Sequence, residues 1–141
     1  MNIHYTDQIE TIDWAALKAE LAADDFDNGR TPAQLQRSAE NSAINIFACD
    51  GARPIGTVRV LSDGVCNAYV VDVWTQSSYR RRGIGRHMME LALAPLQGQH
   101  VYLFTDSHPE FYTALGFAPQ PIGMGRVVGQ WLVNVQTVPG A

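Results

Sequence analysis

Apolar residues recur along the chain with two periods, one typical of helices and one typical of strands. Helical spacing relates Leu17 to Leu21, and Asp13 stands before them as a residue able to cap free backbone N–H groups. Thr31 followed by Pro32 is a second helix start, because proline suits the first helical position. The helices predicted in this way cover residues 13–22, 31–42, 83–96 and 109–115.

Strands are predicted where short apolar or alternating runs lie between turn residues. The run Ala68–Thr75 is almost continuously apolar, as expected for a strand covered on both faces. Asp50-Gly51 marks a hairpin connection between two other runs. The order of elements predicts an α/β protein with helices packed around a mixed sheet. The predicted strands are 2–6, 43–49, 55–61, 68–75, 100–105, a segment from Phe117 onward and a last strand Arg126–Gln136.

Length and composition describe an ordinary globular chain. Its 141 residues, 46% hydrophobic and 17% charged, predict one domain over residues 1–141. We see neither a signal peptide nor an apolar run long enough to span a membrane, so no membrane partner is expected. The two cysteines, Cys49 and Cys66, show neither zinc-ligand nor disulfide spacing. We therefore expect no metal and a reducing, cytoplasmic location.

Charge is distributed unevenly along the chain. Residues 1–50 hold nine acidic and three basic residues, whereas residues 51–141 hold five acidic and seven basic ones. Four arginines lie close together at Arg80, Arg81, Arg82 and Arg86, which indicates either a local anion site or a solvated helix start. The pI of about 5.4 and the single lysine argue against binding to nucleic acid.

The segment from Ala68 to Leu96 joins a buried strand, an arginine-rich loop and a glycine-containing helix start. A helix N-terminus exposes backbone N–H groups and a partial positive charge, and glycine lets a phosphate approach the backbone. This combination predicts a pyrophosphate site. The residues that make a P-loop or a complete dinucleotide-binding fingerprint are absent.

Two motifs resemble those of the GCN5-related N-acetyltransferases. Arg80-x-x-Gly83-x-Gly85 is similar to the acetyl-CoA motif [RQ]-x-x-G-x-[GA], and Phe111–Phe117 reads FYTALGF, similar to the family signature FYxxLGF. Val70–Val73 and Leu103–Ser107 further resemble a subgroup that includes plant-type arylalkylamine (serotonin) acetyltransferases.

The resemblance implies a fold and a set of cofactor contacts. The expected fold has a mostly antiparallel mixed sheet, splayed central parallel strands, and helices on both faces. Main-chain groups at Val73 and Thr75 would pair with pantetheine, and an N–H at Val73 or Trp74 would lie near the thioester oxygen. The expected acetyl-CoA contacts are Val73, Trp74, Thr75, Arg80, Arg81, Arg82, Gly83, Ile84, Gly85 and Arg86.

The resemblance also implies acyl transfer by direct attack of an amine in a ternary complex. Tyr112 matches the family tyrosine that protonates the departing thiolate. Asp72, on the central strand, is a candidate base whose pKa partial burial is expected to raise. Asp106 is a second candidate, and His87, His100, His108, Glu110 and water are weaker ones.

Two functional interpretations remain open beside a simple nucleotide or phosphosugar site. The first is an acetyl-CoA-dependent N-acetyltransferase, and the second is a non-catalytic acyl-CoA-binding or sensing domain. For an enzyme, Asp24, Asp25 and Asp27 predict a cationic small-molecule or peptide amine as the acceptor, because they lie in the acidic first half. Phe26 and Trp74 suit an arylalkylamine, and a homodimer is left open.

Overall fold

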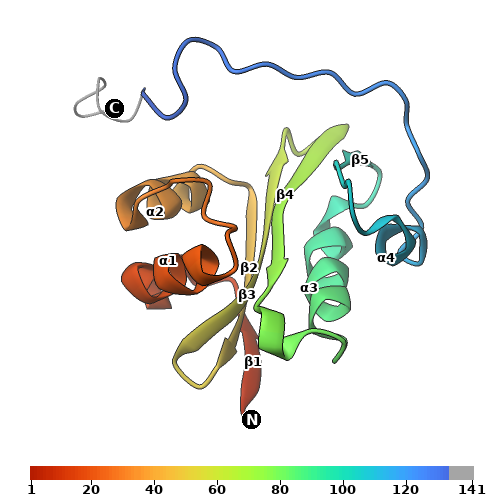
Figure 1. Cartoon of the computed structure of the whole chain (residues 1–141). Coiled ribbons are helices and arrows are strands. Elements are labelled where there is room, and N and C mark those ends of the chain that lie inside the picture. The colour runs from red at the N-terminus through yellow and green to blue at the C-terminus, as the bar shows by residue number, and fades with distance from the viewer. Residues whose placement is uncertain (134–141) are drawn as a thin grey trace. The chain divides into compact units, whose positions relative to one another are not determined.

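The computed structural model describes residues 1–133, which divide into two compact units, Met1–Phe104 and a second that begins at Thr105 (Figure 1). The first unit has three helices, α1 (Trp14–Ala23), α2 (Pro32–Glu40) and α3 (Ile84–Leu93). Its strands are β1 (Ile3–Thr6), β2 (Ile44–Asp50), β3 (Arg53–Ser62), β4 (Asn67–Thr75) and β5 (His100–Tyr102). These elements confirm the predictions up to shifts at their ends. The prediction of one domain over residues 1–141 stays a prediction.

The five strands form one mixed sheet in the order β1-β2-β3-β4-β5. The first four pair antiparallel, whereas β4 and β5 pair parallel, which confirms the expected mostly antiparallel sheet. The parallel pairing joins only Asn67–Tyr69 to His100–Tyr102, and β4 then continues to Thr75 without a β5 partner. The strand predicted to reach Thr105 therefore ends three residues earlier, at Tyr102.

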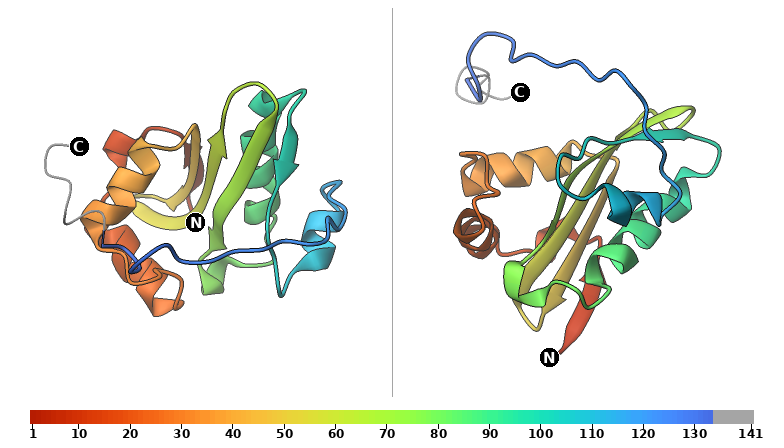
Figure 2. Two further views of the ribbon diagram at one scale, coloured as in Figure 1. Left: turned by 90° about the horizontal axis from the view of Figure 1, so that it is seen from above. Right: turned by 45° about the vertical axis from the view of Figure 1, so that its right-hand side comes forward.

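Helices cover both faces of this sheet, as expected. Figure 2 shows α1 and α2 on one face and α3 on the other. Asp13 caps α1 by accepting a hydrogen bond from the Ala16 N–H at 3.0 Å. At the start of α2, Thr31 and Gln34 form a reciprocal capping box, which satisfies two backbone donors.

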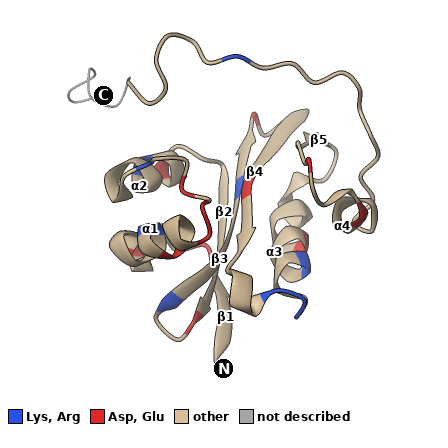
Figure 3. Ribbon diagram, viewed as in Figure 1, with Lys and Arg blue, Asp and Glu red and all other residues tan. Residues whose placement is uncertain are grey.

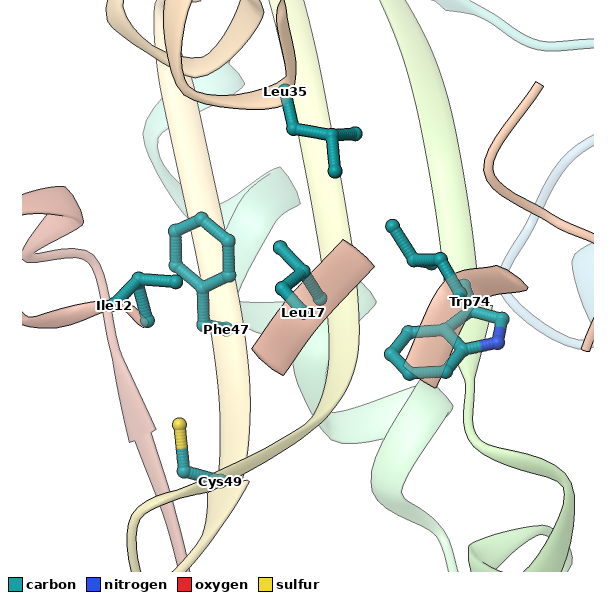
Figure 4. Close-up of a cluster of buried hydrophobic side chains, with 7 residues drawn as sticks. Ile12, Leu17, Leu35, Phe47, Cys49 and Trp74 are labelled. Atoms are coloured by element: carbon teal, nitrogen blue, oxygen red, sulfur yellow. The ribbon is translucent and has the colours of Figure 1, made fainter. Parts of the chain in front are cut away.

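The core on the α1 and α2 side is an apolar cluster drawn in Figure 4, with Leu17 facing the sheet residues Phe47 and Trp74. On the other face, the side chain of Met88 in α3 is fully buried. A Cβ at Gly56 of β3 would lie 2.8 Å from the Met88 Cε, so this glycine permits the close approach of helix and sheet. The complete cluster is Ile12, Leu17, Leu21, Leu35, Phe47, Cys49 and Trp74.

The second unit contains the short helix α4 (Pro109–Thr113), which lies within the predicted helix 109–115. The strand predicted from Phe117 onward is wrong for residues 117–133, which contain no strand. The last predicted strand, Arg126–Gln136, is wrong up to Val133, and residues 134–136 lie outside the described residues. Pro119 and Pro121 lack the N–H that a ladder needs, and the glycines among residues 123–129 contribute no side chain to pack.

Within residues 1–133, no helix combines the length and the apolar character that crossing a membrane requires.

Candidate functional site

The loop between β4 and α3 presents a helix start without a side-chain cap. Gly83 is the N-cap of α3 with φ 79°, and Arg81 before it also has a positive φ, 64°. Gly83 makes no side-chain cap hydrogen bond, so the backbone N–H groups of residues 84–86 are available to an anion. A Cβ on Gly83 would meet nothing within 4 Å. The glycine is therefore required for its left-handed backbone and not for space inside the protein.

Several contacts hold this loop against the sheet. The Tyr79 hydroxyl, in the 3₁₀ turn Ser77–Tyr79, donates to Asp50 at 2.6 Å. Guanidinium groups of Arg53 and Arg82 lie over the Tyr79 ring, 5.5 and 5.7 Å from its centre. Arg80 Nε donates to the Thr75 carbonyl at 3.0 Å. The conformation of the loop is thus determined by partners on β2, β3 and β4.

The predicted acetyl-CoA contacts from residue 80 to residue 86 lie together at this helix start. Figure 3 shows basic positions along the loop that enters α3. The four arginines are exposed, and Arg86 pairs with Glu90 one turn later, at 2.9 Å. Ile84 is buried, so it offers an anion only its backbone N–H. The arrangement suits a pyrophosphate held by backbone N–H groups with guanidinium groups around it.

A β-bulge bends β4 close to the other predicted cofactor contacts. Thr57 of β3 pairs with Trp74 and Arg59 pairs with Val71, so Asp72 and Val73 together face one β3 residue. Asp72 has φ 54°, and its carbonyl accepts a hydrogen bond from the Thr57 hydroxyl at 2.7 Å. A bulge removes its extra residue from the ladder and re-aims the neighbouring groups. Main-chain groups at Val73 are therefore candidates to bind a ligand.

Asp72 is the centre of an ion cluster with two arginines. Arg30, from the segment before α2, donates to both Asp72 carboxylate oxygens at 2.7 and 3.2 Å, and Arg59 Nε donates at 3.0 Å. Burial raises the pKa of Asp72, but hydrogen bonds and charges from Arg30 and Arg59 lower it more, and the net pKa lies below its ordinary value. The expectation of a raised pKa was wrong, because the carboxylate is paired. A carboxylate held in this way is a poor proton acceptor.

The ion cluster forms the polar end of a pocket between α1, α2 and the sheet. The space between its walls is about 380 Å³ when the part open to solvent is counted, and only a small part of that space is enclosed by protein. Most of its wall is apolar. The lining residues are Trp14, Leu17, Leu21, Phe26, Arg30, Leu35, Ala39, Asn45, Phe47, Thr57, Val58, Arg59 and Asp72.

Two of the three loop aspartates that predicted a cationic acceptor are engaged within the protein. Asp24 accepts hydrogen bonds from Trp74 Nε1 at 2.9 Å and from the Ser77 N–H at 3.0 Å. Asp27 forms an ion pair with Lys18. Asp25 is exposed. Trp74 is a core residue outside the pocket lining, and Phe26 is a wall of the pocket. The preference for a cationic amine stays a prediction. Its electrostatic support is weaker, because Asp24 and Asp27 already have partners within the protein.

The second unit carries the other two catalytic candidates. Tyr112 is buried, and its ring packs edge-on against Phe111 and Phe117 at 4.9 and 6.1 Å between centres. Burial raises the pKa of the Tyr112 phenol, which keeps the proton on the hydroxyl at neutral pH. Asp106 is exposed. The roles of both residues stay predictions.

Arg30 and Arg59 are the site residues that sequence reasoning missed. A signal existed for Arg59, since it interrupts the apolar strand around Val58 and Val60, as Asp72 interrupts the next strand. Opposite charges on neighbouring apolar strands indicate a buried pair. Arg30 follows a glycine in a polar loop, where nothing local indicates that it is 6% exposed. Neither cysteine forms a disulfide, and residues 1–133 contain no cluster of potential metal ligands.

Comparisons with known proteins agree with these features. The model of the Acetyltransferase (GNAT) family matches residues 6–117. Over 100 residues the chain is 33% identical to "Serotonin N-acetyltransferase 2, chloroplastic" of Oryza sativa subsp. japonica, a match that covers 65% of this chain and 50% of the relative. The chain spans half or less of the length of the curated relatives that it matches.

Solved structures share the fold. A protein assigned to the GNAT acetyltransferases from Xanthomonas campestris pv. campestris superimposes with a TM-score of 0.77 at 24% identity, over 91% of this chain and 94% of that one. A structure assigned as an acetyltransferase from Deinococcus radiodurans R1 gives a TM-score of 0.77 at 26% identity, over 89% and 88% of the two chains.

Proposed function

Because this chain belongs to the GNAT family of acetyltransferases, we propose that it transfers an acetyl group from acetyl-CoA to a primary amine in a ternary complex. The observation that carries the proposal is that one continuous segment holds both a β-bulge and an uncapped helix start. The bulge lies in β4 at Asp72 and Val73, and the helix start is that of α3 at Gly83. The bulge suits a thioester oxygen, and the helix start suits a pyrophosphate.

Acetyl-CoA would contact this segment mostly through its backbone. N–H groups from Arg81 to Arg86 would hold the pyrophosphate, with Arg80 among the charged neighbours. Main-chain groups at Val73 and Thr75 would pair with the pantetheine amides, beyond the point where β5 pairing ends at Tyr69. An N–H at Val73 or Trp74 would stabilise the negative charge that develops on the thioester oxygen.

The chemistry requires one bond to form and one to break. The amine nitrogen, having lost a proton, attacks the acetyl carbonyl carbon, and the C–S bond then breaks. Tyr112 would protonate the departing thiolate. Burial raises the pKa of its phenol, so the hydroxyl still carries its proton when the C–S bond breaks. Asp106 or water would accept the proton of the amine, and Asp72, paired with two arginines, is the weaker candidate base. We keep the cytoplasm as the proposed location, which fits the two free cysteines.

The proposal is tested by incubating the protein with acetyl-CoA and a panel of primary amines while measuring free thiol and acetylated product. We expect thiol release that depends on an amine. Tight CoA binding without transfer to any amine would favour the alternative, a non-catalytic acyl-CoA-binding or sensing domain. Calorimetric titration with ATP in place of CoA tests the third interpretation, a general nucleotide site.

The role of Tyr112 is tested by Tyr112→Phe, which removes the proton donor and keeps the ring that packs on Phe111 and Phe117. We expect kcat to fall by roughly 10²–10⁴-fold with little change in KM for acetyl-CoA. Phe111→Leu is the matched control, because it alters the same ring packing without removing a hydroxyl. A Tyr112→Phe rate within about twofold of wild type would make this tyrosine structural.

A further inference from the structure

The pocket described above has an unusual charge balance for a site expected to receive a cation. Its lining holds two guanidinium groups, Arg30 and Arg59, and one carboxylate, Asp72. The remaining lining residues are apolar or uncharged, so the polar end carries one net positive charge. Apolar walls have a low dielectric constant, which strengthens electrostatic interactions at this position relative to the surface.

The acidic residues near the pocket do not neutralise this charge. Asp27 is paired with Lys18, and Asp24 accepts from Trp74 and Ser77 with Arg80 3.8 Å away. Neither Asp24 nor Asp27 lines the pocket.

Arg30 and Arg59 differ in how many of their guanidinium nitrogens donate hydrogen bonds within the protein. Arg30 directs Nη1 and Nη2 to Asp72 and Nε to the Asp27 carbonyl at 3.1 Å. Arg59 directs Nε to Asp72 and Nη1 to Ser42 at a long 3.3 Å. Among the contacts within residues 1–133, none occupies Arg59 Nη2, and the Arg59 side chain is 19% exposed. Arg59 is thus the guanidinium able to bind an incoming anion.

We propose that the pocket binds an α-amino acid with an apolar side chain, and that Arg59 recognises its carboxylate. This inference rests on the proposed function, because it names the acceptor amine for that reaction. An α-amino acid carries its amine and carboxylate on one carbon. The carboxylate would pair with Arg59, and the amine would lie beside Asp72 and the β4 bulge. The side chain would contact Trp14 and Phe26, the partly buried aromatic residues of the lining. Transfer would yield the N-acetyl amino acid and free CoA, with the C–S bond broken and the new C–N bond formed.

The first experiment measures acceptor preference with matched amines. Phenylalanine and phenethylamine differ only in the carboxylate, so the ratio of their kcat/KM values with acetyl-CoA isolates its effect. We expect wild type to prefer phenylalanine by about tenfold to hundredfold, the range for a charge-assisted hydrogen bond. Arg59→Gln should remove most of this preference, and Arg59→Lys should retain part of it. Arg37→Gln, exposed on α2, should leave the ratio unchanged.

The second experiment needs no acetyl transfer, so it separates this inference from the proposed function. With CoA present, titration calorimetry compares 3-phenylpropanoate with its uncharged amide. Wild type should bind the acid at least about tenfold more tightly, and Arg59→Gln should bind both alike. Equal binding of acid and amide by wild type, or a preference for phenethylamine, would overturn the anionic acceptor and favour the cationic one. Failure to acetylate any amine, with the acid still preferred, would overturn only the proposed function.

Discussion

Two groups of arginines in this protein differ in almost every physical respect. The arginines at 80–86 lie on one loop, are exposed, and surround a helix start. Arg30 and Arg59 come from distant segments, and they meet around Asp72 at the end of an apolar pocket. The loop arginines face solvent, where a large anion can reach them. Arg30 and Arg59 instead hold a half-buried carboxylate, and the hydrogen bonds within residues 1–133 leave Nη2 of Arg59 for a ligand.

Arginine therefore contributes mainly to ligand binding in the loop and mainly to stability in the ion cluster. Exposed charges contribute little to folding, so the loop arginines are available for ligand contacts. Buried charges must be paired, and removing one partner leaves the others uncompensated. Substitutions in the loop should therefore change CoA binding with little effect on stability. Substitutions in the ion cluster should lower stability, and at Arg59 they should also change acceptor binding, so the unfolding midpoint of Arg59→Gln is measured before its binding is compared.

The largest expected effect is that of Asp72→Asn on stability. The substitution leaves Arg30 and Arg59 without their carboxylate. Removing one partner of a fully buried pair costs about 3–5 kcal/mol, and for this half-buried cluster we expect the lower end of that range. Urea unfolding followed by circular dichroism measures the loss. Glu20→Gln is the matched control, because it breaks a more exposed pair with Arg53 and should cost about 1 kcal/mol or less. Equal losses in the two variants would erase the distinction between the two groups of arginines.

A smaller effect, on binding alone, is expected for Arg80→Ala. Loss of a guanidinium near the pyrophosphate should weaken CoA binding by about 1–3 kcal/mol, the range for a hydrogen bond to a charged group. The unfolding midpoint should barely move, because the Arg80 side chain is 53% exposed. Calorimetric titration with CoA measures the affinity, and Arg37→Ala serves as the exposed control. Unchanged CoA affinity would remove Arg80 from the proposed site.

Gly83→Ala should weaken CoA binding as much as Arg80→Ala does, or less. The substitution acts through the backbone conformation. An alanine held at φ 79° costs about 1–2 kcal/mol, although space for its Cβ is free. We expect a lower unfolding midpoint together with weaker CoA binding, since the alternative backbone re-aims the first N–H groups of α3. Gly85→Ala, which the acetyl-CoA motif itself tolerates, should retain CoA binding. A Gly83→Ala protein with unchanged stability and affinity would show that the left-handed cap is unnecessary.

The smallest expected effect is a pH dependence of the ion cluster. The folded pKa of Asp72 lies below its ordinary value, about 3.9 in an unfolded chain. The stabilisation is therefore complete above that unfolded value and is lost as pH falls through the folded pKa. The stability gap between wild type and Asp72→Asn should stay constant from pH 7 to pH 5 and narrow below about pH 4. Urea midpoints at each pH test this, and a gap that widens in acid would contradict it.

Local signals were sufficient for most helices, strands and the cofactor loop. Asp13, Thr31 and Gly83 act within a few residues of their own position, and each stands where the structure places a helix start. The predicted strands that are wrong lie within residues 117–133, where prolines and glycines interrupt the apolar pattern. Trp131 and its apolar neighbours fall into no strand within residues 1–133, although their pattern alone favours one.

The motif loop, the order of the elements and the resemblance to the acetyltransferases can all be predicted from the sequence, because they depend on neighbouring residues. The protonation behaviour of Asp72, in contrast, depends on contacts that form only in the folded protein. A carboxylate on a buried strand has a raised pKa if it is alone and a lowered one if it is paired, and its partners lie 13 and 42 positions away in the chain. The pocket likewise depends on the tertiary structure, because its walls come from α1, α2, the segment between them, β2, β3 and β4. Its charge depends on which side chains the fold brings together there.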